Sequence, residues 1–236
     1  MQILNILLIA IPLGLAPGMG IAFFIYFRDK YEKEPFRLLR NSFLFGLLSI
    51  VPAILIEIGF GKLGIDENQS LFKTLLYAFF VVGIAEEMSK FFFLRVYAYR
   101  KKDFNEPFDG IVYSIMISMG FATLENVMYV ASGGISAALL RMFTAVPLHA
   151  VCAIFMGYFV GKAKFSKHPF LNMLLGCGMA VFMHGLYDFF LFQQLMAGLA
   201  ILSFIALAAA IGVSFIAINK SENDSPFRKG GSLSSL

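Results

Sequence analysis

The chain has 236 residues, of which 59% are hydrophobic and only 14% are charged. A soluble domain of this length cannot bury that much apolar surface, so the composition excludes a soluble globular protein and indicates a multi-pass protein of the cell membrane. The net charge of +4 does not indicate nucleic-acid binding, because the basic residues lie in short segments between apolar runs. The expected surroundings are therefore a lipid bilayer.

Apolar runs of about 20 residues, the length that crosses the hydrocarbon core, recur along the whole chain. They predict seven spans, in chain order 3–27, 41–61, 72–95, 108–131, 138–161, 170–192 and 198–218. The expected fold is all-α, a polytopic bundle of about seven transmembrane helices that forms a single domain over residues 1–220. The polar residues 221–236 are expected to be a flexible cytoplasmic tail.

Basic residues are unevenly divided between the loops, and this division predicts the orientation in the membrane. One set of loops carries only Lys62, Lys73 and Arg141. The other set, with the tail, carries Arg28, Lys30, Lys33, Arg37, Arg40, Arg100, Lys101, Lys102, Lys162, Lys164, Lys167, Lys220, Arg228 and Lys229. Because Lys and Arg accumulate in cytoplasmic loops, the N-terminus is predicted to lie outside and the C-terminus in the cytoplasm.

Two GxxxG spacings lie within predicted spans, at Gly14–Gly18 and Gly157–Gly161. Glycine lets helix backbones approach closely, and the spacing is common in membrane helices. We expect both to serve packing within the chain rather than a dimer interface.

Four of the predicted spans carry ionisable side chains where lipid disfavours them. A charge near the bilayer centre costs several kcal/mol, so such residues usually face a bundle interior or a watery cavity and have a function. They are Glu86, Glu87 and Lys90 in the third span, Glu125 with Asn126 in the fourth, His149 in the fifth, and His184 with Asp188 in the sixth. The spans run in alternating directions, which places all these groups in the middle and outer half of the membrane. We expect them to converge on one active site.

Sequence spacing suggests how some of these groups cooperate. His184 and Asp188 are four residues apart, so they share a helix face and the carboxylate can orient the imidazole. Two neighbouring carboxylates resist being charged together, which makes one of Glu86 and Glu87 a candidate base and the other an acid or hydrogen-bond partner. The spacing does not distinguish them. Hydrolysis needs such a base to deprotonate water, a proton donor and a group that holds the oxyanion.

Two other charged residues in apolar segments are expected to lie outside this site. Glu57 is near the outer end of the second span, where we expect it to reach water. Arg141 is near the outer surface and is expected to anchor its helix.

Two alternatives remain open from the residues alone. A zinc ion held by Glu87 (or Glu86), Glu125, His149 and His184 would suit histidine and carboxylate ligands, although no HExxH motif is present. Buried acids and histidines also form proton relays in transporters, but the chain shows no inverted repeat of the kind that many carriers have. The first expectation is a peptidase that uses a glutamate-activated water and no cofactor.

The ordered motifs resemble the PrsW family of bacterial intramembrane proteases, which is related to the CAAX-prenyl endopeptidases. The similarity includes EExxK at 86–90, FATLEN at 121–126, His149 and HGLYD at 184–188, together with Ala16-Pro17-Gly18 and Phe108-Asp109-Gly110. This resemblance implies cleavage on the extracytoplasmic side of a single-span anti-sigma factor. It also implies that Glu86, Glu87 and His184 are required, with Glu125 and His149 as further site members. Lys90, Asn126 and Asp188 are expected to support them, and Asn126 to help bind the oxyanion.

Overall fold

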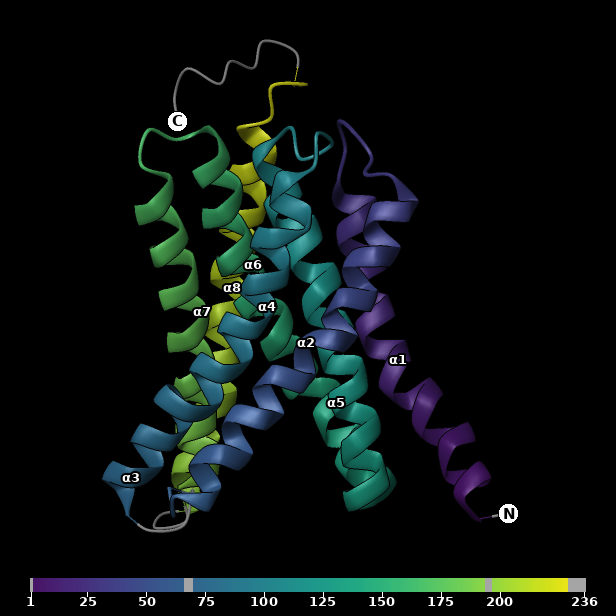
Figure 1. The fold of residues 1–236 in the computed structure, drawn as a ribbon, viewed down its shortest axis with the longest axis vertical. Coiled ribbons are helices and arrows are strands. Elements are labelled where there is room, and N and C mark those ends of the chain that lie inside the picture. Colours follow the sequence, from purple (N-terminus) through teal and green to yellow (C-terminus); the bar gives the residue numbers. More distant parts are fainter. Residues whose placement is uncertain (1, 66–69, 194–196, 229–236) are drawn as a thin grey trace.

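A computed structural model describes residues 2–65, 70–193 and 197–228, and in these ranges the secondary structure is entirely helical. The long helices extend between the two ends of the bundle, with α1 and α2 tilted in opposite directions, and the beginning of α1 and the end of α8 lie at opposite ends (Figure 1). The all-α membrane bundle is thus confirmed. The α-helices are α1 (Gln2–Arg28), α2 (Phe36–Lys62), α3 (Leu71–Leu76), α4 (Ile84–Val96), α5 (Pro107–Phe143), α6 (Ala145–Phe165), α7 (Pro169–Phe192) and α8 (Ala200–Asn223). A π-helix η1 (Tyr77–Gly83) and two 3-10 helices, η2 (Ala98–Arg100) and η3 (Ala197–Leu199), complete the described elements.

Six helical segments within the described ranges are long and apolar enough to cross a membrane, where the sequence predicts about seven. They are Ile11–Arg28, Phe36–Lys62, Pro107–Ser132, Gly134–Phe165, Pro169–Phe192 and Ala200–Asn223. The predicted span 72–95 is helical too, but α3, η1 and α4 follow one another there, and none of them alone reaches spanning length. A π-helix widens the turn and interrupts the regular α-helical ladder. The chain is a multi-pass membrane protein.

The helix α5 contains a reversal at Gly134. This glycine has φ 77°, a conformation that costs glycine little and other residues more. After Gly134 the chain turns back and lies beside the part of α5 that precedes it. Arg141 contacts Asn126, 15 residues earlier. A straight helix would separate those two residues by about 22 Å. The reversal falls in the gap between the predicted spans 108–131 and 138–161, and it carries residues 135–143 back toward the centre of the bundle.

The core lies around α5, which packs against α1, α2 and α6. Glycines permit the closest approach: a Cβ added to Gly157 would lie 2.4 Å from the backbone oxygen of Gly110 on α5. A Cβ added to Gly14 would lie 2.8 Å from Cγ2 of Val127. Both predicted GxxxG spacings therefore serve packing within the chain, because each one already faces α5.

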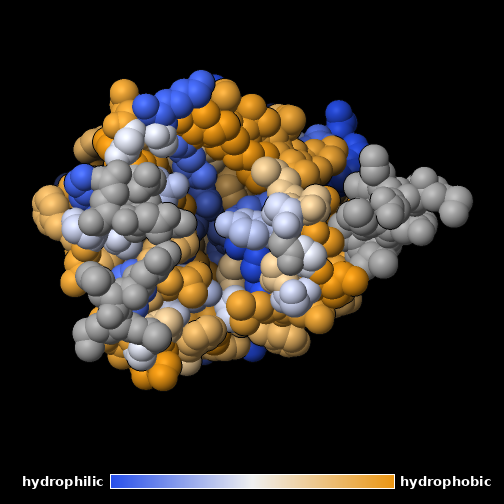
Figure 2. Space-filling view, turned by 90° about the horizontal axis from the view of Figure 1, so that it is seen from below, coloured by the Kyte–Doolittle hydropathy of each residue, from blue (hydrophilic) through white to orange (hydrophobic). Residues whose placement is uncertain are grey.

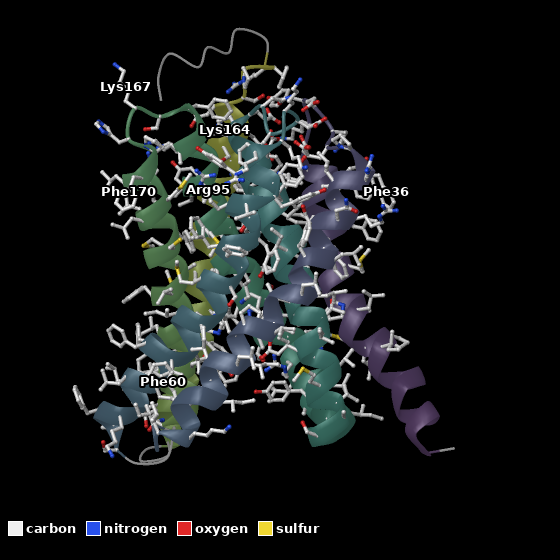
Figure 3. All side chains as sticks on the ribbon, in the orientation of Figure 1. Phe36, Phe60, Arg95, Lys164, Lys167 and Phe170 are labelled. Carbon is white, nitrogen blue, oxygen red and sulfur yellow. The ribbon has the colours of Figure 1, made fainter. Side chains whose placement is uncertain are left out.

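Basic side chains gather at one end of the bundle. Arg28 and Lys30 both pair with Glu222 on α8, at 2.5 Å and 2.9 Å. Figure 3 shows Arg95, Lys164 and Lys167 toward the same end, whereas Phe60 lies toward the other. By the positive-inside rule this end is predicted to be cytoplasmic, and that orientation stays a prediction.

The expected tail begins later than residue 221. The helix α8 continues to Asn223, and Ser221, Glu222 and Ser225 are buried. The ion pairs of Glu222 with Arg28 and Lys30 explain why the helix extends, because they attach its last turn to the end of α1 and the segment that follows it. The remainder of the expected tail, residues 229–236, lies outside the described residues.

Candidate active site

Three helices bring two glutamates and two histidines together inside the bundle. Glu86 and Glu87 come from the first turn of α4, His149 from the first turns of α6 and His184 from α7. Each residue contributes one atom, a histidine ring nitrogen or a carboxylate oxygen, and these four atoms all lie within 4.8 Å of one another. All four side chains are buried. The polar residues of three predicted spans thus form one cluster.

Lys90 lies at the centre of this cluster, one turn along α4. Its Nζ donates to Glu86 Oε2 at 3.1 Å and to Glu87 Oε1 at 2.8 Å, and it lies 3.1 Å from His149 Nδ1. The ammonium also lies over the ring of Phe121, 4.0 Å from its centroid. A buried cation with two carboxylates offsets the cost of holding those charges away from water.

His184 is held from two sides by carboxylates. Its Nδ1 is 2.7 Å from Glu87 Oε1, and its Nε2 is 3.3 Å from Asp188 Oδ2, one turn further along α7. The predicted sharing of one helix face by His184 and Asp188 is present. Two flanking carboxylates fix the ring orientation and stabilise positive charge on the imidazole.

His149 is connected to α5 through Glu125. The His149 Nε2 is 2.8 Å from Glu125 Oε2. Because the Lys90 ammonium can only donate to Nδ1, we infer that Nε2 carries the ring proton and donates to Glu125. The imidazole is thereby fixed between a cation and a carboxylate.

Arg141 belongs to the same network, although the sequence places it as an anchor. Its guanidinium pairs with Glu125 at 2.6 Å, its Nε donates to Asn126 Oδ1 at 3.1 Å, and it stacks over Tyr129 at 3.9 Å. The reversal at Gly134 is the reason, since it returns Arg141 to the level of Glu125. The glycine pair at 133–134 is the sequence signal that could have indicated this return.

A cavity of about 820 Å³ reaches the cluster. The two glutamates differ in their access to it. Glu86 lines the cavity with His149 and His184, whereas Glu87 is 0% exposed and lies behind them. The supporting residue Asp188 also lines it. Asn126 is fully buried and is absent from the cavity lining, so the expected contact of Asn126 with an oxyanion has no support.

The cavity lies toward the end of the bundle opposite the basic residues. Its walls include Tyr77 of η1, Leu191 of α7 and Phe204 of α8, which all lie toward that end. Figure 2 views the molecule from this end and shows a central hollow in which hydrophilic residues appear between hydrophobic ones. Glu57 of α2 also lines the cavity, which corrects the expectation that it lies outside the site. Its half-buried side chain turns inward.

A second acidic group lies at the basic end of the bundle, near the start of α5. It consists of Glu32, Glu34 and Asp109. The Asp109 carboxylate accepts the backbone N–H groups of Asn105 and Glu106, and Tyr113 donates its hydroxyl to Glu34. Burial raises the pKa of Glu34 to about 7. These contacts cap α5 and connect it to the segment before α2, so this group has a structural role.

Comparison with known proteins identifies the chain's family. The family model described as PrsW family intramembrane metalloprotease matches residues 34–216. This chain belongs to the PrsW family. The matched region contains every member of the buried cluster.

Relatives named Protease PrsW extend over most of the chain. The one from Geobacillus kaustophilus (strain HTA426) is 36% identical over 182 residues, which are 77% of this chain and 79% of the relative. The one from Bacillus subtilis (strain 168) is 34% identical over 75% of this chain and 80% of its own length. The one from Clostridioides difficile (strain 630) is 34% identical over 76% and 77%. No solved structure matches this chain. The protein is an intramembrane peptidase.

Proposed function

We propose that this PrsW-family protein hydrolyses a peptide bond near the extracytoplasmic side of a single-span membrane protein, with Glu86 as the base that activates water. The position of Glu86 carries the proposal. Its Oε2 lies 3.8 Å from His184 Nε2 and 3.9 Å from His149 Nδ1, at the cavity wall. Both distances exceed a direct hydrogen bond, so Glu86 bonds to neither imidazole and its carboxylate can accept from a water molecule in the cavity.

In this mechanism the neighbouring side chains have different tasks. The water oxygen attacks the peptide carbonyl carbon while Glu86 takes the water proton, which it then transfers to the leaving amine. His184 keeps its Nδ1 contact with Glu87 and moves its Nε2–H hydrogen bond from Asp188, 3.3 Å away, to the oxyanion. Glu87 and Asp188 are positioning residues for His184. Glu125 positions His149, and Arg141 in turn holds Glu125.

The position of the cavity supports cleavage on one side of the membrane. It lies toward the end of the bundle that carries few basic residues, which is the predicted extracytoplasmic side. A single-span protein could present its juxtamembrane residues there. The family resemblance adds an anti-sigma factor as the proposed substrate.

Cleavage by purified protein tests this proposal. In liposomes, the wild-type protein should cut a single-span anti-sigma factor at one bond near its extracytoplasmic membrane boundary, with the product ends mapped by mass spectrometry. The Glu86→Gln/Glu87→Gln double variant should leave the substrate intact, because no base remains. Cleavage by the double variant at the wild-type rate would contradict the proposal.

A zinc-dependent form of the same hydrolysis is a second candidate, because the donor set fits. Two histidines and two carboxylates converge within 4.8 Å, and one oxygen of Glu87 is buried without a hydrogen-bond partner. Glu86, Glu87, His149 and His184 would hold the ion, whereas Glu125, expected among the ligands, is engaged by Arg141. Zinc, when bound, would activate water as a Lewis acid. The Lys90 ammonium, however, already contacts three of the four donors.

Metal analysis separates the two candidates. With Glu86 as the base and Lys90 as the central cation, the active protein should contain less than about 0.1 equivalent of zinc, and chelator should change neither cleavage nor the melting temperature. Elemental analysis and thermal unfolding in detergent measure both quantities. One equivalent of zinc whose removal lowers the melting temperature would favour the metal-dependent form.

A further inference from the structure

Glu57 contributes a carboxylate to the cavity that the proposed hydrolysis does not use. It lies on α2, three residues before Phe60, which Figure 3 labels toward the outer end of the bundle. Its half-buried side chain lines the same cavity as Glu86. Because about one helical turn separates it from Phe60, Glu57 lies toward this end of the bundle.

The other acids on the cavity wall each have a partner. Glu86 pairs with Lys90 at 3.1 Å, and Glu125 pairs with Arg141 at 2.6 Å. Asp188 contacts His184 at 3.3 Å. Among the described residues, Glu57 forms no ion pair, so it is the one acid of this wall whose carboxyl group has no paired cation or histidine there.

An unpaired carboxylate inside a membrane segment is costly, and such residues usually serve a ligand or a pathway. Apolar side chains such as Ile50, Ile54 and Met128 make up much of the cavity lining. A carboxyl group without a paired cation, next to apolar side chains, suits a long side chain that has an aliphatic stem and a cationic end. Lys and Arg have this form.

We propose that Glu57 forms a subsite for a Lys or Arg side chain of the substrate, on the extracytoplasmic side of the cleaved bond. This inference rests on the proposed peptidase function and adds a substrate class to it. The substrate supplies the cation that Glu57 does not find among the described residues, when its extended segment enters the cavity. Peptide segments with a basic residue at that position are therefore selected over neutral and acidic ones.

A substrate scan with full-length protein in liposomes tests the subsite. A single-span substrate with an all-alanine flank receives Lys, Ala or Asp at each of several successive positions beside the cleaved bond. At one position the wild-type protein should cleave the Lys substrate with a kcat/KM about 10-fold above the Ala substrate, and the Asp substrate should be slower than Ala. The ratio between substrates is the readout, so a change in overall activity does not affect it.

Two variants of Glu57 test the contribution of its charge, one by removing the carboxylate and one by replacing it with a cation. In Glu57→Gln the Lys-to-Ala ratio should fall to about one, and in Glu57→Lys the Asp substrate should become the preferred one. Equal cleavage of all three substrates at every position by the wild-type protein would overturn the subsite and leave the peptidase function standing. A Lys preference that persists in Glu57→Gln would overturn it as well. Absence of any cleavage by the wild-type protein would overturn the proposed function and the subsite with it.

Discussion

Glu86→Gln should lower kcat for peptide cleavage by about 10²- to 10⁴-fold, the contribution typical of a general base. The amide keeps the shape of the side chain and its contact with Lys90, but it cannot accept the water proton. KM should change little, because Glu86 contacts water in the proposed mechanism and not the body of the substrate. Single-turnover cleavage of a reconstituted substrate measures the chemical step directly.

Ser89→Ala is the matched control for this substitution. Ser89 is buried on the same helix, where its hydroxyl donates to the backbone oxygen of Ala85, and it does not line the cavity. Its loss should change kcat by less than about 3-fold, since only one side chain to backbone hydrogen bond is removed. If Glu86→Gln kept more than about a tenth of the activity while Glu87→Gln lost it, the base would be Glu87.

Lys90→Met should destabilise the protein by about 3–5 kcal/mol, because it removes the cation from a buried ion-pair network. Lys90 is 2% exposed and contacts two carboxylates that are at most 6% exposed. The methionine fills a similar volume, so the loss reflects charge rather than a cavity. Denaturant unfolding in detergent micelles, followed by helical circular dichroism, measures the change in the free energy of unfolding.

The double variant Lys90→Met/Glu87→Gln provides the control for charge. It removes one cation and one carboxylate together, so its free energy of unfolding should lie closer to that of the wild-type protein than that of Lys90→Met does. If Lys90→Met alone unfolded like the wild-type protein, Lys90 would not compensate the carboxylates. The glutamates would then be held in another way.

Much of the fold follows directly from hydropathy. Lipid requires long helices whose backbone groups are satisfied internally, so apolar runs of about 20 residues indicate the helices and most of their bounds. Hydropathy does not predict the π-helix within the expected span 72–95, because no pattern of apolar residues distinguishes a π-helical turn from an α-helical one. The end of α8 is another case, because the ion pairs of Glu222 join residues almost 200 positions apart.

For the site, too, one part could be predicted from the sequence and another part only from the structure. Glu86, Glu87, Glu125, His149, His184 and Asp188 stand out in the sequence, because a charged or polar group in lipid is costly enough to require a reason. Their tasks depend on direction and neighbours, which the sequence does not contain. Only the assembled bundle turns Glu86 toward the cavity and Glu87 away from it, returns Arg141 to Glu125, and places Glu57 on the cavity wall. The cost of a charge in lipid is a property of one residue, whereas the role of that charge arises from contacts between helices far apart in the chain.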